Sequence, residues 1–170
     1  MKNVERLNNR YGDDKVFDGC SIFGVMDTSG GMIPADVAVE AIDLMRDRDN
    51  GLGGGFAAYG LYPGHADEYA IHAMYMSDGG KRDTEAYLKE YFSVALTEAM
   101  DTDPTALPDA PAMWRYFATP RADRTIGKDE RQCVADHTMY INTRIADSFI
   151  FSAGKNMGVF KGVGHPFDVA

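Results

Sequence analysis

Cys20 is the residue in this sequence best suited to covalent chemistry. It follows Gly19 and opens an apolar run over residues 20–26, at the border between a polar leader and the globular pattern. A buried, inert thiol is the commoner state of a free cysteine. If residues 1–19 are removed, however, Cys20 acquires an α-amino group with a pKa of about 7.7–8.0, which can act as the general base for its own thiol. Acyl transfer would then need no histidine partner.

The remaining polar candidates give weaker signals. The chain has four histidines and they show no metal-ligand spacing, so no metal site is assigned; they are His65, His72, His137 and His165. His72 and His137 fall on patterned faces, where a histidine satisfied within the core is the simplest interpretation. Cys133 is interpreted as packing on a helix. A charged cluster surrounds the first helix, and only Arg48 is kept from it as a candidate.

A glycine-rich stretch over residues 51–60 contains Gly53-x-Gly55-x-x-Ala58, which formally satisfies a dinucleotide-binding pattern. That pattern requires a strand before it and a helix after it. Here a helix precedes and a strand follows. We therefore interpret the glycines as allowing close backbone approach where a helix joins a strand.

The elements that must position these residues are predicted from apolar periodicity, and they describe an α+β fold. Strands are expected at 20–26, 56–62, 69–76 and 113–118, and a hairpin at 148–152 and 157–161 around Ala153-Gly-Lys-Asn156. Helices are expected from Pro34 to Asn50, after Thr84 through Phe92, and from near Gly127 to Ile145. The Pro- and Asp-rich stretch 101–111 is predicted to be a surface loop.

Composition limits the classes of function. The chain has 170 residues, 25% charged and 45% hydrophobic, which is typical of one globular domain. Its net charge of −9 repels phosphate backbones, which disfavours a nucleic-acid partner. No run approaches the roughly 20 apolar residues of a membrane helix. We expect a soluble, cytoplasmic protein, and its two cysteines are too few for a disulfide framework.

Three segments together resemble the start of class II glutamine amidotransferases, which are N-terminal-nucleophile (Ntn) hydrolases. They are Cys20-Ser-Ile-Phe-Gly24, the helix end Met45-Arg-Asp-Arg48, and the glycine-rich residues 50–60. Residues 152–164 are similar to the amidotransferase subunit of archaeal-type glutamate synthase and its N-methylglutamate synthase relatives. The similarity spans most of residues 20–170.

The resemblance implies a four-layer αββα sandwich, of which residues 20–170 form the N-terminal part after residues 1–19 are removed. It implies that Cys20 attacks the carboxamide of glutamine, that a glutamyl thioester forms, and that ammonia passes to a glutamate-synthase-like partner. No cofactor is expected in this chain, whereas the partner synthase would carry flavin and iron–sulfur clusters. Arg48 matches the arginine of the family's Arg-Gly segment, where a cation would favour the thiolate.

The sequence also departs from the family pattern. Asp49 replaces the glycine after Arg48, and Ser21 stands where most members have glycine. The family's substrate-binding arginine, its oxyanion-hole Asn-Gly pair and its amine-binding aspartate are absent from these 170 residues. Asn50-Gly51 falls too early for that role. Substrate-binding residues are thus expected beyond Ala170, in a fragment, or are missing from a split or degenerate protein.

Two other functions remain open at this point. One is a noncatalytic Ntn-fold subunit that binds a partner or senses a small amide. The other is a redox-reactive thiol protein, which is the weakest of the three hypotheses because no resolving cysteine lies near Cys20 in the sequence.

Overall fold

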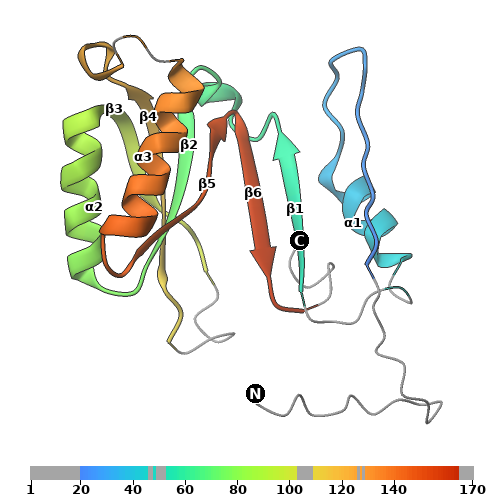
Figure 1. Cartoon of the computed structure of the whole chain (residues 1–170). Coiled ribbons are helices and arrows are strands. Elements are labelled where there is room, and N and C mark those ends of the chain that lie inside the picture. The colour runs from blue at the N-terminus through green and yellow to red at the C-terminus, as the bar shows by residue number, and fades with distance from the viewer. Residues whose placement is uncertain are drawn as a thin grey trace. The chain divides into compact units, whose positions relative to one another are not determined.

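The computed structural model describes residues 20–45, 48, 53–102, 109–125, 127 and 129–164. Over these residues the fold is α+β, as expected, with two antiparallel sheets and three α-helices (Figure 1). The chain divides into two compact units, Met1–Gly55 with Lys161–Ala170, and Phe56–Phe160. The expected leader, residues 1–19, lies outside the described residues.

The first unit contains the segment that follows Cys20. The expectation of a buried strand at residues 20–26 is wrong, because this segment has no regular structure and is largely exposed, with Ile22 89% and Met26 79% exposed. Apolar residues favour an extended backbone, but a strand also needs a neighbour to accept its hydrogen bonds. Within the described part of the chain, no strand pairs with this segment.

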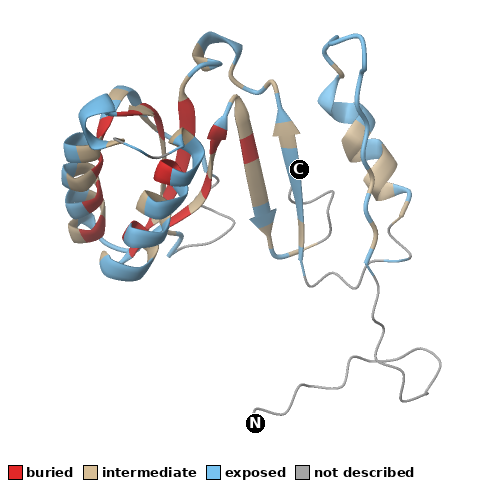
Figure 2. Cartoon of the chain, turned by 45° about the horizontal axis from the view of Figure 1, so that its top comes forward, coloured by how far each residue is buried: buried red, intermediate tan, exposed pale blue. Residues whose placement is uncertain are grey.

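Helix α1 (Ala35–Asp43) confirms the predicted first helix, although it ends earlier than expected. Pro34 precedes its first turn, where a missing N–H costs nothing. No residue of α1 is fully buried, and its apolar stripe is only half-buried (Figure 2). The expected end signals Arg46 and Asn50-Gly51 lie outside the described residues.

The second unit is built on a four-stranded antiparallel sheet with the order β3-β4-β2-β5. In chain order its elements are β2 (Tyr69–Tyr75), α2 (Asp78–Tyr91), β3 (Phe92–Ala99), β4 (Ala112–Pro120), α3 (Glu130–Arg144) and β5 (Ser148–Lys155). Short 3₁₀ turns, η2 (Pro63–His65) and η3 (Ala122–Arg124), lie in the connections before β2 and after β4. This βαββαβ order, with the first and third strands adjacent at the centre, is the ferredoxin-like split β-α-β arrangement.

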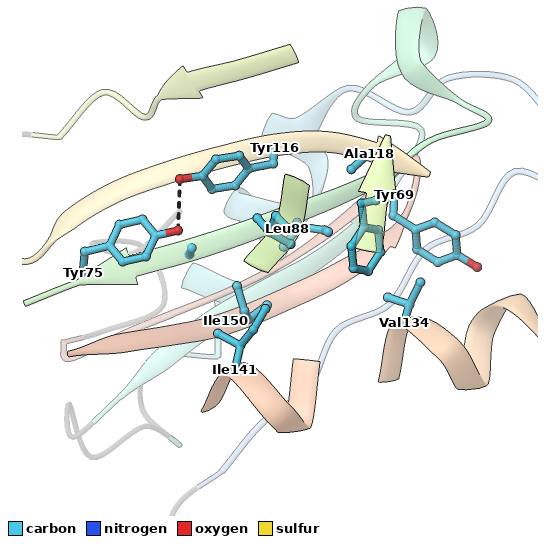
Figure 3. Close-up of a cluster of buried hydrophobic side chains, with 11 residues drawn as sticks. Tyr69, Tyr75, Leu88, Tyr116, Ala118, Val134, Ile141 and Ile150 are labelled. Carbon is cyan, nitrogen blue, oxygen red and sulfur yellow. Dashed lines mark hydrogen bonds between the residues drawn. The ribbon is translucent and has the colours of Figure 1, made fainter. Parts of the chain in front are cut away.

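Helices α2 and α3 cover one face of this sheet, and the hydrophobic core lies beneath them (Figures 1 and 3). The core side chains alternate along the strands, so that Ile71, Ala73 and Tyr75 of β2 all face the helices. Leu88 from α2 and Ile141 from α3 pack onto them, each 1% exposed. Burying each such side chain contributes about 2 kcal/mol.

Helix α2 begins well before the expected position after Thr84. Its first turn, Asp78-Gly-Gly-Lys81, carries no apolar stripe, so periodicity could not locate the start. Ser77 caps the helix by accepting a hydrogen bond from the Gly80 N–H at 3.2 Å. At its other end, Phe92 does not belong to the helix as predicted. It opens β3, which the sequence analysis missed, and its side chain is buried in the same core.

The prediction that residues 148–152 and 157–161 form a hairpin is wrong, and this is the largest difference in topology. Both of its strands exist, as β5 and β6 (Met157–Gly162), but they do not pair with each other. Strand β5 pairs with β2, whereas β6 pairs with β1 (Gly54–Tyr59) in a separate two-stranded sheet. Asn156, with φ of 49°, turns the chain from one sheet to the other.

Several other expectations are confirmed with shifted boundaries. The strand at 113–118 lies inside β4, and the helix expected near Gly127 is α3. Strand β2 is buried on both faces, whereas β1 is mostly exposed and ends at Tyr59, before Gly60, whose φ is 82°. Residues 101, 102 and 109–111 of the expected loop lie outside helices and strands. Its centre, 103–108, is not described.

The close approach of α2 to the chain before β5 generates a stability prediction. A Cβ on Gly80 would lie 2.5 Å from the Asp147 carbonyl oxygen and 2.8 Å from that of Ala146, so we expect Gly80→Ala to lower the free energy of unfolding by about 1–3 kcal/mol. Gly79→Ala is the matched control, because its nearest neighbour would be Ser77 Oγ at 3.6 Å. Urea denaturation should show the control to be as stable as the parent. Equal stability of both variants would contradict the packing argument.

Candidate functional site

Cys20 is exposed and stands at the start of the described chain. Its thiol is therefore open to solvent in an irregular segment. The prediction that Cys133 packs on a helix is confirmed, since Cys133 is 2% exposed on α3. Of the two thiols, only Cys20 can be reached by a substrate without opening the core.

A tight turn at Asp27 follows the Cys20 segment. Asp27 Oδ1 accepts hydrogen bonds from the Ser29 backbone N–H at 2.7 Å and from the Ser29 hydroxyl at 2.6 Å. The bond from the Ser29 hydroxyl has the largest effect and the bond from its backbone N–H the next, and together they hold the pKa of the Asp27 carboxyl below its ordinary value. Gly30 completes the turn with φ of 82°. The turn separates the Cys20 segment from α1 by a defined local structure.

Arg48, the second predicted site residue, is exposed and its backbone N–H donates to the Met45 carbonyl at 2.9 Å. Among the residues that the structure describes, no hydrogen bond or ion pair joins Arg48 to Cys20. Asp49, Asn50 and Gly51 lie outside those residues. The proposed pairing of this cation with the thiol is therefore untested by the geometry.

A polar cluster that sequence reasoning missed lies on the sheet face opposite α2 and α3. Arg115 of β4 donates to Glu98 Oε1 through Nε at 2.7 Å and Nη2 at 2.6 Å. Its Nη1 donates to the Tyr62 hydroxyl at 3.3 Å, and this hydroxyl lies 2.7 Å from His72 Nε2. The sequence contains one signal for this cluster, which is Arg115, a charged residue between Trp114 and Tyr116 in an otherwise apolar strand.

His72 is fully buried within this cluster, as the interpretation of a core histidine predicted. Its ring lies against Tyr62, Phe151 and Phe160. Burial, and then the charge of Arg115, lower the pKa of His72 from 6.5 to about 4. Nδ1 makes no hydrogen bond of normal geometry, although the backbone of Ser152 opposite the ring favours the protonated form. The imidazole is consequently neutral at physiological pH.

The other histidines are also engaged by neighbours. His65 stacks on Phe117 with ring centroids 4.0 Å apart and bonds to Glu68 through Nδ1. His137 Nδ1 lies 2.7 Å from the Tyr87 hydroxyl, between α2 and α3. His165 lies outside the described residues. Across the described ranges, no group of three or more His, Cys, Asp or Glu side chains could hold a metal ion.

A chain of hydroxyl groups crosses the helix-covered core. The Tyr75 hydroxyl donates to that of Tyr116 at 3.0 Å (Figure 3). Tyr116 in turn donates to Glu85 Oε1 at 3.1 Å. Burial raises the pKa of Tyr75 to about 12. This series of hydrogen bonds ends at a shallow groove beside α2, which is lined by Glu85, Lys89 and Thr97 among others. Because Lys81 neutralises Glu85 at 2.8 Å, these groups satisfy one another.

The comparisons with known proteins identify a similar archaeal protein but no family. No protein-family model matches the chain. It is 40% identical over 163 residues to an uncharacterized protein of Archaeoglobus fulgidus, and the match covers 92% of the chain and 43% of that protein. The chain therefore spans less than half of this relative's length. None of the helices in the described ranges is long and apolar enough to cross a membrane.

The buried histidine makes stability depend on pH. In the unfolded chain His72 titrates near 6.5, but in the folded protein its pKa is about 4, so between these values the unfolded state binds more protons. The contribution of neutral His72 to the free energy of unfolding should therefore be complete above pH 6.5. It should be lost as the pH drops toward 4, which lowers the free energy of unfolding by at most roughly 3 kcal/mol.

His72→Gln is the matched variant, because its amide can still bond to Tyr62 but does not titrate. Its unfolding free energy should vary less with pH in this window than that of the parent. Thermal or urea unfolding at several pH values measures the difference. Identical pH profiles would show that His72 is not the group responsible.

Proposed function

We propose that this chain supplies the nucleophile-bearing part of a class II glutamine amidotransferase. The observation that carries the proposal is the arrangement of the segments that resemble this family. They lie within residues 20–60 and 152–164, before the βαββαβ unit and from the second half of β5 onward, and they include β1 and β6, which pair with each other. Two segments far apart in the chain thus belong to one small sheet.

The arrangement supports an interpretation in which the βαββαβ unit, residues 69–155, is inserted into an amidotransferase framework. In this interpretation β1 and β6 belong to one sheet of the αββα sandwich of Ntn hydrolases. The joint is short and hydrogen-bonded: Asn156 accepts from the Gly60 N–H through its carbonyl oxygen and from the Tyr62 N–H through Oδ1, both at 2.7 Å. The insertion therefore leaves and returns at nearly the same place.

The proposed chemistry begins after cleavage between Gly19 and Cys20. The new α-amine takes the proton of the Cys20 thiol, and the thiolate adds to the carboxamide carbon of glutamine. When the tetrahedral intermediate collapses, the C–N bond breaks and the nitrogen leaves as ammonia with the proton returned by the amine. Water then hydrolyses the thioester to give glutamate and free thiol. The exposure of Cys20 is compatible with access by glutamine.

Oxyanion donors and substrate-binding groups would come from polypeptide outside these 170 residues, since the family's motifs for them are not in the sequence. The ammonia would pass to a glutamate-synthase-like partner. Because the chain spans 43% of its archaeal relative, these activities of a whole protein are part of the proposal.

The test combines mass spectrometry with active-site labelling. In protein that includes the polypeptide supplying the substrate-binding groups, intact mass should show that the mature chain begins at Cys20, and a diazoketone analogue of glutamine should add once to that residue. Cys20→Ala should abolish labelling, whereas Cys133→Ala, which removes the buried thiol, should retain it. Ammonia release from glutamine by protein that still carries residues 1–19 would refute the mechanism. Absence of both processing and labelling would favour the noncatalytic alternative.

A further inference from the structure

The sheet face opposite α2 and α3 carries a row of apolar side chains that crosses all four strands. In the strand register, Met74 of β2 lies opposite Phe149 of β5 and opposite Met113 of β4. Met100, just after β3, continues the row, because its N–H donates to the Met113 carbonyl at 2.9 Å. We call these four residues the methionine row.

The alternation of side chains places this row away from the helices. Ala73, Tyr75 and Trp114 pack in the helix-covered core. Met74, between the first two, and Met113, directly before Trp114, therefore point to the opposite face. Phe149 is 41% exposed, and the three methionines are half-buried. Methionine and aromatic side chains are enriched at interfaces between polypeptides, so a row of them that solvent can reach is suited to binding another chain.

The neighbouring part of the same face is already covered. Next along the strands come His72, Arg115 and Glu98, which bond to Tyr62 and to one another. Beyond them His65 stacks on Phe117. The segment from Tyr62 to His65 therefore covers these parts of the face, and the methionine row lies outside the part that it covers.

The end of the sheet nearest the row is acidic. At this end β2 passes into α2 and β5 begins (Figure 1). Each of the four strands has an exposed aspartate close to this end, and these are Asp78 after β2, Asp101 after β3, Asp109 before β4 and Asp147 before β5. Asp147 Oδ2 accepts a hydrogen bond from the Ser77 hydroxyl at 2.9 Å, and the other carboxylate oxygen remains for a partner cation. The nearby bases Lys81 and Arg82 are paired with Glu85 and Asp83. Arg144, in the last turn of α3, lies three residues before Asp147.

We propose that the methionine row binds a basic amphipathic segment of a partner polypeptide, whose apolar side chains cover Phe149 and the methionines while its Lys and Arg side chains meet the four aspartates. Flexible, polarisable methionines adapt to apolar side chains of varied shape. The negative rim selects positive charge and repels a second copy of this chain, whose net charge is −9. Apolar residues spaced at i, i+3, i+4 and i+7 would present such a stripe from a helix.

The test uses the full chain and a synthetic amphipathic Leu/Lys helix of about 15 residues. With ¹³C-methyl-labelled methionine, we expect the signals of Met74, Met100 and Met113 to shift on titration, and that of Met139, which is 61% exposed on α3, to remain in place. A peptide with Glu in place of each Lys should bind far more weakly. Added salt should weaken the binding of the basic peptide.

Two matched pairs of variants locate the site. Phe149→Lys should weaken binding by about tenfold, whereas Met139→Lys, an equally drastic change at an exposed residue of α3, should not. Asp101→Lys should weaken it in the same direction, and Asp67→Lys, an exposed aspartate in the segment before β2, should not. All four positions are exposed, so folding should be retained and is checked by circular dichroism.

Three results would overturn the proposal. One is the absence of methionine shifts at millimolar peptide, and another is equal binding of the acidic and basic peptides. The third is a concentration-dependent dimer, detected by sedimentation, that Phe149→Lys abolishes, because a second copy would then be the occupant. None of these results depends on Cys20, so the proposed amidotransferase chemistry is judged separately.

Discussion

The burial of β2 on both faces is the constraint on which the second unit depends. Strand β2 is the central strand, hydrogen-bonded to β4 on one side and β5 on the other. Its helix-facing side chains form the core, and its opposite face holds His72, which is fully buried. A one-residue slip would exchange these two sets of side chains and place an imidazole against Leu88 and Ile141. The register is therefore determined from both sides at once.

Burial of a titratable ring has a cost that the surrounding residues offset. Tyr62 bonds to Nε2, and the same hydroxyl accepts from Arg115, whose charge is balanced by Glu98. Arg115 also lies over the Tyr62 ring, 4.8 Å from its centroid. Because Tyr62 comes from the segment that links β1 to β2, the cluster ties this connection to the sheet. The polar cluster thus orders a connection that has few residues of regular structure.

The sequence predicted those features that depend on local pattern. The apolar stripe of α1, the apolar strand β2 and the extended segments β5 and β6 are all evident from spacing and composition. The start of α2 was hidden because its first turn contains two glycines and is specified by the Ser77 cap and the contact of Gly80 with Asp147. Cys20 was the natural candidate nucleophile, but the Arg115–Tyr62–His72 cluster joins three separate segments, which no local pattern reveals.

The failed hairpin prediction has a specific cause in the bulge of β5. Strict alternation from Ile150, which packs under the helices, would place Ser152 on the helix side as well. The register between β2 and β5 instead shifts between His72 and Ala73, and it is Ala153 that packs against the helix-covered core. Ser152 is thereby turned to the other face, where its Oγ accepts the Val159 N–H of β6 at 3.1 Å. The extra residue lets the chain complete one sheet and enter the other. The sequence does not indicate this bulge, because Ser148-Phe-Ile-Phe-Ser152 has the same pattern that an unbulged strand would have.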